Sequence, residues 1–114
     1  MEKLKESFNR QNLRYTLLKR DEQLAIFGIS GTFNYNILHY EVVMVRIRDD
    51  QYGHRESVPS DEEFGKTKPD RHFQKIVEAL TYFDEWTARL MQGVREKDEK
   101  VVTHQQIEKP SLLY

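Results

Sequence analysis

The chain has 114 residues, of which 38% are hydrophobic and 32% are charged, and its formal net charge is −1. This composition predicts one small folded domain and argues against a globally basic nucleic-acid-binding protein. The lack of cysteine excludes disulfides, thiol catalysis and cysteine-ligated metal sites. No apolar run approaches the roughly 20 residues of a membrane span, and the N-terminus has no apolar signal core, so we expect a cytoplasmic protein.

The first third of the sequence predicts a short helix followed by a β-hairpin. Residues 2–11 are rich in charge and place Leu4 and Phe8 four positions apart, which is the spacing of one helix face. Residues 13–19 and 24–29 have the alternation and apolar content of strands. Because a short polar turn joins them, we expect the two strands to pair antiparallel.

The strongest strand signal runs from Ile37 to Arg48. Both of its faces carry apolar side chains in the middle, whereas a sheet covered on one side alternates more cleanly. We therefore expect something to cover part of the second face. The candidates are the N-terminal helix, the C-terminal tail and another copy of the protein.

A long amphipathic helix is predicted from about residues 69–70 to about Gln92. Its apolar positions recur at helical spacing, and Tyr82 and Trp86 widen the apolar stripe. A stripe of this width indicates contact with more than one surface. Gly93 is the predicted stop.

Together these elements predict an α+β fold: a three-stranded antiparallel sheet with one long helix packed on a face and a short N-terminal helix. We expect residues 1–94 to form a single domain. Residues 95–114 are expected to form a charged linker and C-terminal tail, with a short extra strand near 101–107 as an alternative. The apolar end, 110–114, is interpreted either as a frayed terminus or as a docking tail.

The segment 55–67, between the best strand and the best helix, is explained in large part by local folding. Ser60 and Glu63 have the spacing of a capping box, in which each residue satisfies the other's backbone N–H. Phe64 is expected to plug the edge of the core, and Gly65 to end the turn with a positive φ. The remaining charged groups are free to face a partner.

The same segment carries a resemblance to a group of proteins. A strand, then Arg-Glu-x-x-Pro-Ser-Asp-Glu-Glu-Phe-Gly-Lys from Arg55 to Lys66, then a helix, resembles small uncharacterised proteins of bacteriophages and other mobile elements, notably of gut bacteria. The matching residues run from about His39 to Phe83. In that group an aromatic pair often follows the Phe-Gly-Lys, whereas residues 67–70 here are Thr-Lys-Pro-Asp. The resemblance implies a phage or mobile-element accessory protein and carries over no activity.

No catalytic, cofactor-binding or metal-binding constellation is expected. The four histidines are scattered, and no two lie four apart on one helix face: His39, His54, His72 and His104. We interpret them as solvent-exposed groups; the alternative is that His54 joins the acids of a folded-back loop at 61–63. The adjacent acids at 62–63 and 84–85 are interpreted as charged surface rather than a facing acid and base.

The favoured function is a non-enzymatic protein-interaction module, and one concrete version is an inhibitor of a host defence protein. Its supports are the two-faced strand, the aromatic helix stripe and the apolar tail, because aromatic residues are enriched at interface hot spots. The partner is another protein or a second copy in a homodimer. The predicted partner-binding residues lie in or near the loop: Tyr52, Arg55, Asp61, Glu62, Glu63 and Lys66.

The alternative is a nucleic-acid-binding protein that uses a basic sheet face and the basic N-terminus. Arg46 and Arg48 are two apart, so both would point from one face of a strand, which Tyr40 shares. The competing interpretation is that both arginines pair with nearby acids. The predicted nucleic-acid-binding residues are Lys3, Lys5, Arg10, Arg14, Arg46 and Arg48.

Overall fold

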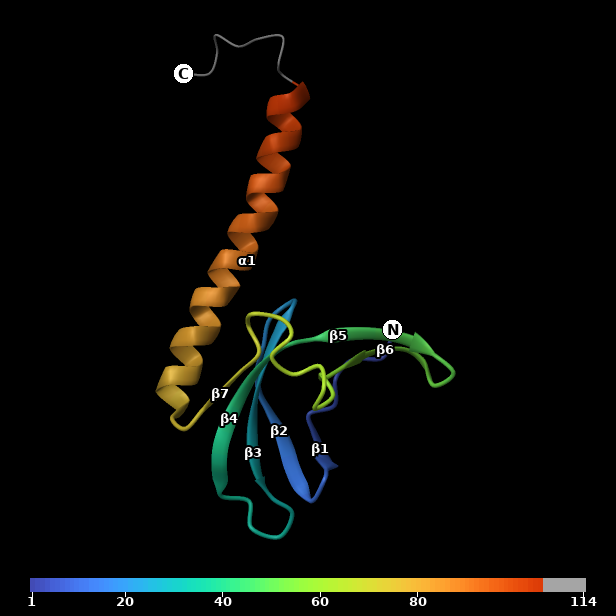
Figure 1. Cartoon of the computed structure of the whole chain (residues 1–114), viewed down its shortest axis with the longest axis vertical. Helices are drawn as coiled ribbons and strands as arrows, with labels where there is room; N and C mark the ends of the chain where they lie inside the picture. Colours follow the sequence, from blue (N-terminus) through green and yellow to red (C-terminus); the bar gives the residue numbers. More distant parts are fainter. Residues whose placement is uncertain (106–114) are drawn as a thin grey trace.

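The structure is a computed structural model that describes the backbone of residues 1–105 and the side chains of residues 1–93. Within this part, five strands form an antiparallel sheet in the order β1-β2-β3-β4-β7, β5 and β6 form a separate hairpin, and one helix follows (Figure 1). The bounds are β1 Ser7–Arg10, β2 Leu13–Arg20, β3 Leu24–Gly31, β4 Ile37–Met44, β5 Arg46–Asp50, β6 Gly53–Ser57, β7 Arg71–Phe73 and α1 Ile76–Gln105.

The fold is α+β, but the predicted three-stranded sheet with an N-terminal helix is wrong. The end of the predicted N-terminal helix is strand β1, which pairs with β2 through a two-residue turn. Gln11 and Asn12 form this turn with φ of 53° and 65°, the left-handed geometry that suits the twist of a tight hairpin. Phe8 stacks on Tyr15 across the two strands, with ring centroids 5.0 Å apart. The spacing of Leu4 and Phe8 predicts a helix, but Phe8 lies in a strand.

The predicted strand from Ile37 to Arg48 is also wrong as a single element. It breaks at Val45, whose N–H donates to the carbonyl of Gln23 (2.8 Å), and the chain continues as β5. β5 and β6 form a hairpin that projects to one side of the sheet (Figure 1). Its two-residue turn is followed by Gly53 at a φ of 104°, a conformation that glycine adopts without steric cost.

The long helix is present, but both of its predicted ends are wrong. It begins at Ile76 rather than at 69–70, because residues 71–73 pair with β4 as β7. It continues through Gly93 to Gln105, so residues 101–105, offered as part of an extra strand, are helical. Residues 106–114, with the predicted docking tail, lie outside the described residues. The division at residue 94 stays a prediction.

Strand β3 lies in the middle of the core, and its residues from Leu24 to Ser30 are all buried. Because side chains alternate across a strand, Leu24 and Ile26 point to one face of the sheet. On that face they pack with Ala79 and Phe83 of α1. This is the helix face of the sheet. The described helix contains no segment long and apolar enough to cross a membrane.

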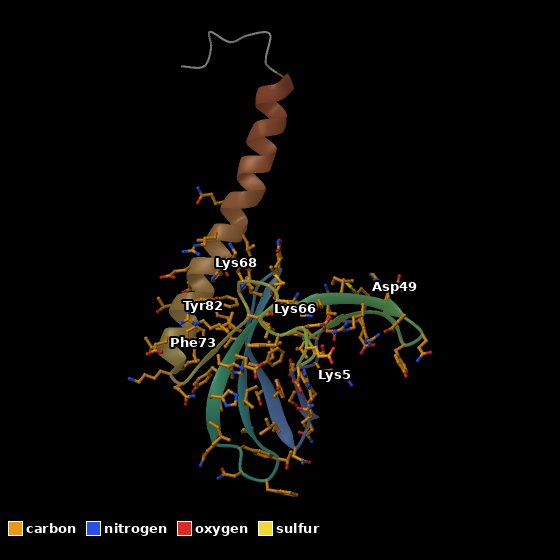
Figure 2. The ribbon with its side chains drawn as sticks, viewed as in Figure 1. Lys5, Asp49, Lys66, Lys68, Phe73 and Tyr82 are labelled. Carbon is orange, nitrogen blue, oxygen red and sulfur yellow. The ribbon has the colours of Figure 1, made fainter. Side chains whose placement is uncertain are left out.

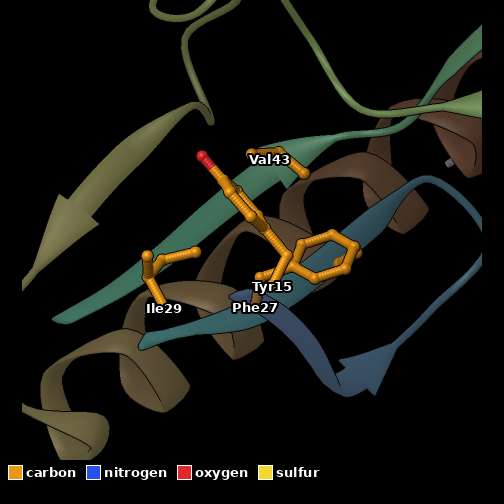
Figure 3. Packing of buried hydrophobic residues seen from close by; sticks show 5 residues of the cluster. Tyr15, Phe27, Ile29 and Val43 are labelled. Carbon is orange, nitrogen blue, oxygen red and sulfur yellow. The ribbon is translucent and has the colours of Figure 1, made fainter. Parts of the chain in front are cut away.

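The opposite face of the sheet, which we call the loop face, holds a second apolar cluster. Ala25, Phe27 and Ile29 of β3 pack there with Tyr15 and Val43 (Figure 3). Partly buried side chains pack on this cluster: Phe8 of the edge strand β1, and Val58 and Phe64 of residues 58–70, which we call the 58–70 connection. This connection therefore covers part of the second face, where an N-terminal helix, the tail or another copy was expected.

Candidate functional site

The predicted capping box in the 58–70 connection is confirmed. The Ser60 N–H donates to Glu63 Oε1 (2.8 Å), and the Glu63 N–H donates to Ser60 Oγ (3.3 Å). The guanidinium of Arg48 also donates to Glu63 Oε1 (2.5 Å). This hydrogen bond from Arg48, followed by the one from Ser60, lowers the pKa of Glu63 to about 2. Gly65 has the predicted positive φ (89°), so local chemistry shapes this turn.

A buried ion pair fixes the end of the same connection. Arg46 donates to both carboxylate oxygens of Asp70, at 2.9 and 2.7 Å, and the N–H groups of Met44 and Gly65 donate to them as well. Burial by itself raises the pKa of Asp70, but these hydrogen bonds outweigh it and hold the pKa below its ordinary value. Asp70 therefore joins β4, β5 and the connection.

The predicted partner-binding residues occupy two separate parts of the molecule. Tyr52 and Arg55 lie on the β5–β6 hairpin, at the distal end of which Figure 2 marks Asp49. Arg55 pairs with Asp50 (2.6 Å) and lies 5.7 Å from the centre of the exposed Tyr52 ring. The hydrogen bond with Arg55, followed by one from the Tyr52 N–H, lowers the pKa of Asp50.

The other predicted partner-binding residues lie on the 58–70 connection. Asp61 pairs with Arg10 of β1 (2.8 Å) and accepts a hydrogen bond from Gln11 (2.9 Å). Glu62 and Lys66 are exposed, and Figure 2 labels Lys66 on the connection. The structure therefore uses Asp61 and Glu63 to hold the connection and leaves Glu62 and Lys66 on its surface.

The arginines of the nucleic-acid hypothesis are engaged within the protein. Arg46 is bound by Asp70 and is only 15% exposed, and Arg48 is bound by Glu63. These contacts match the competing interpretation, in which both arginines pair with acids. The nucleic-acid hypothesis stays untested, but Arg46 and Arg48 do not form an exposed pair that would support it.

The remaining cations of that hypothesis lie on the N-terminal segment, on β1, where Arg10 pairs with Asp61, and on β2. Lys3 and Lys5 are exposed, and the Lys3 ammonium is 3.9 Å from Glu56. The Arg14 guanidinium lies 4.8 Å from the centre of the Tyr35 ring. The N-terminal lysines are therefore the more accessible part of the predicted basic surface.

Two histidines and a glutamate meet on the loop face of the sheet; we call His39, Glu41 and His72 the His–Glu–His cluster. His39 and Glu41 are two apart on β4, so they share a face, and His72 on β7 is the direct cross-strand partner of Glu41. The Glu41 Oε2 atom is 3.8 Å from His39 Nε2 and 3.7 Å from His72 Nδ1. The possible ligand atoms of the three residues all lie within 4.8 Å of one another.

Two members of the His–Glu–His cluster border a pocket of about 140 Å³. Glu41 and His72 line it together with Tyr15, Phe64 and the Arg10–Asp61 pair. Burial raises the pKa of Glu41 above its ordinary value, and the imidazoles of His72 and His39 offset only part of the rise. Burial, followed by the charge of Glu41, also raises the pKa of Tyr15. The pocket thus combines an apolar wall with nitrogen and oxygen donors.

The sequence interpretation missed this cluster because it treated the histidines as scattered. The alternation of β4 places His39 and Glu41 on one face, but residue 72 falls within the predicted long helix. Nothing local indicates that residues 71–73 pair with β4. His54 lies on the hairpin with Nδ1 3.8 Å from Asp49, and among the described side chains only the His–Glu–His cluster groups three donors.

A second feature that the sequence left unassigned is the end of the sheet where β3 turns into β4. Four large apolar side chains are exposed there within a short stretch, and we call them the β3–β4 tip: Phe33, Tyr35, Ile37 and Leu38. Phe33 is fully exposed. The Asn36 N–H donates to the side chain of Asn34 (3.1 Å), which holds a local turn in the loop.

Comparison with known proteins gives no match to a protein-family model, a curated protein or a solved structure.

Proposed function

We propose that this chain is a non-enzymatic protein-interaction module that binds its partner through the β3–β4 tip. The observation that carries the proposal is the exposure of Phe33, Tyr35, Ile37 and Leu38 within six consecutive positions. Contiguous exposed apolar side chains on a small protein mark interaction surfaces more often than scattered ones do.

The chemistry of the tip supports protein rather than nucleic acid as the partner. Aromatic side chains supply large contact areas, and tyrosine and arginine are both enriched at interface hot spots. The Arg14 guanidinium lies 4.8 Å from the centre of the Tyr35 ring, a cation–π contact that favours this position of the ring. The flanking loop contributes the polar groups Asn34 and Asn36.

The aromatic helix stripe, which also suggested an interface, has internal partners. Phe83 is buried, and Tyr82 and Trp86 pack around the same apolar cluster on the helix face. Figure 2 shows Tyr82 beside Phe73 of β7, and their ring centroids are 4.9 Å apart. The exposed tip is therefore a better candidate than the stripe for binding a partner.

The narrower proposal is a phage or mobile-element accessory protein that inhibits a host defence protein. Its support is the resemblance of Arg55–Lys66 to the phage and mobile-element group. Asp61 and Glu63 of that segment are used within the fold, so Glu62 and Lys66 are the residues of the segment left for a partner.

The test compares capture of partners from a bacterial lysate by the wild-type chain and by the double variant Phe33→Ser, Tyr35→Ser. We expect the double variant to lose captured protein by about 10-fold or more, because truncation of aromatic hot spots costs about 2 kcal/mol or more each. The matched control is Tyr52→Ser, which removes an aromatic ring that is 73% exposed on the hairpin. Capture by the control should equal that of the wild type.

Light scattering at several concentrations identifies the case in which the partner is a second copy. A wild-type dimer that becomes monomeric in the double variant would assign the tip to self-association. Capture that is equal in all three proteins would contradict the role of the tip. Recovery of nucleic acid alone, in amounts that fall steeply with salt, would favour the basic N-terminus instead.

A further inference from the structure

We propose that the His–Glu–His cluster is a binding site for one divalent transition-metal ion of the zinc type. The ligands are His39 Nε2, a carboxylate oxygen of Glu41 and His72 Nδ1. Two imidazole nitrogens and one carboxylate oxygen are a donor set that proteins use for zinc and for non-haem iron.

The geometry of the cluster is close to what an ion requires. Metal–nitrogen and metal–oxygen bonds of about 2.0–2.2 Å place the ligands of a tetrahedral ion roughly 3.4 Å apart. The Glu41 oxygen lies 3.8 and 3.7 Å from the two ring nitrogens, so small side-chain rotations bring both pairs to that separation. The strand register fixes the backbone of all three residues, which keeps the ligands together before an ion binds.

The surroundings of Glu41 distinguish it from the other buried acids. Glu56 is bound at both carboxylate oxygens by Arg20, and Asp70 is bound in the same way by Arg46. Glu41 has only 11% of its side chain exposed, and the groups that form its ion-pair contacts are two imidazoles. A buried carboxylate needs a compensating positive charge, and a divalent ion held by the same imidazoles supplies it.

Three protein ligands leave a coordination position for a further group. Glu41 and His72 line the pocket of about 140 Å³, which has room for several waters at roughly 30 Å³ each. Arg10 and Tyr15 line the same pocket and offer hydrogen-bond donors to an oxygen ligand. The site is thus of the open kind, with water or a small oxygen-containing group as the additional ligand.

The choice of ion follows from the donors. Imidazole nitrogen suits Zn²⁺, Co²⁺, Ni²⁺ and Fe²⁺, whereas Mg²⁺ and Ca²⁺ prefer a shell of oxygens. We therefore expect Zn²⁺ and Co²⁺ to bind and Mg²⁺ to leave the protein unchanged.

The experiment titrates Co²⁺ into the chelator-treated full chain and follows the visible absorption of protein-bound cobalt, with Zn²⁺ as competitor. We expect one ion per chain. His72→Gln removes a ligand from the short edge strand β7, and its side chain is 56% exposed, so the fold should tolerate the change. Affinity should fall by at least about 10-fold, because even loss of a group outside the ligand shell costs that much. His54→Gln, which lies on the hairpin, is the matched control and should bind as the wild type does.

The variant Glu41→Gln should also weaken Co²⁺ binding, and its circular dichroism and Tm without metal show whether it folds. If it does not fold, nitrogen NMR of the wild-type histidines decides the case. Zn²⁺ that shifts the ring signals of His39 and His72, and leaves those of His54 and His104 in place, supports the site. Equal cobalt affinity in wild type and His72→Gln, no bound ion, or shifts confined to His54 or His104 would overturn it.

Discussion

The two faces of the five-stranded sheet are covered in different ways. On the helix face, one regular element packs Ala79 and Phe83 on Leu24 and Ile26, and the contact is apolar. On the loop face, the covering element is the irregular 58–70 connection. That face combines an apolar cluster with a buried ion pair, a partly exposed ion pair, a pocket and the His–Glu–His cluster.

The difference follows from how each cover satisfies its backbone. A helix bonds its own N–H and C=O groups, so its face can be purely apolar. A connection without regular hydrogen bonds must find partners in side chains, and Asp70 and Glu63 serve as such acceptors. Each acceptor then requires a cation, which Arg46 and Arg48 provide. Polar chemistry therefore accumulates on the loop face, where the candidate metal site also lies.

The largest expected effect in this comparison is on the helix face. Phe83→Ala removes a fully buried ring from the contact between α1 and the sheet. Such truncations cost about 3–5 kcal/mol, because they remove apolar burial and leave a cavity. Urea unfolding measures the change in the free energy of unfolding. The control is Val77→Ala on the same helix, where the side chain is 69% exposed, and there we expect a change of at most about 0.5 kcal/mol. Equal losses in the two variants would mean that α1 does not pack as described.

A smaller but still large effect is expected on the loop face. Asp70→Asn keeps the shape of the side chain and leaves Arg46 buried without its counter-charge. Removing one charge of a buried ion pair lowers the free energy of unfolding by about 3 kcal/mol. The same urea experiment should show this loss, and Asp49→Asn, on the exposed hairpin, should change stability by less than about 0.5 kcal/mol. If the two variants are alike, the Arg46–Asp70 pair does not hold the 58–70 connection.

The sequence predicts the features that depend on local chemistry. The spacing of Ser60 and Glu63 predicts their capping box, because the interacting groups are within a few residues of one another. The glycine at position 65 likewise predicts the positive φ that is found there. The strands 13–19 and 24–29 are confirmed as β2 and β3 for the same reason, since alternation and apolar runs are local patterns.

The features that the sequence does not predict depend on distant contacts. Phe8 fits one face of a helix as well as a strand, and only its packing on Tyr15 and Phe27 selects the strand. The pairing of residues 71–73 with β4 is supported by Asp70, whose side chain binds Met44 and Arg46. His72 therefore lies beside Glu41 because of contacts that no local pattern encodes. For this reason the sequence alone does not predict the candidate metal site.

The smallest expected effect is the change in the free energy of unfolding when Glu63 is protonated at low pH. Its folded pKa of about 2 lies below its ordinary value, so its contribution to stability is complete above that ordinary value and is lost as pH falls toward about 2. Because the Arg48–Glu63 pair is partly exposed, we expect Glu63→Gln to cost at most about 1 kcal/mol at neutral pH. Urea unfolding of wild type and variant between pH 7 and pH 2 should show this difference shrinking as the pH falls. Glu62→Gln, at the exposed neighbouring position, should parallel the wild type at every pH. A difference in the free energy of unfolding between wild type and Glu63→Gln that stays constant across this pH range would contradict the prediction. It would mean that the variant loses stability through the capping box and not through the charge of Glu63, and that the loop face does not depend on the Arg48–Glu63 ion pair.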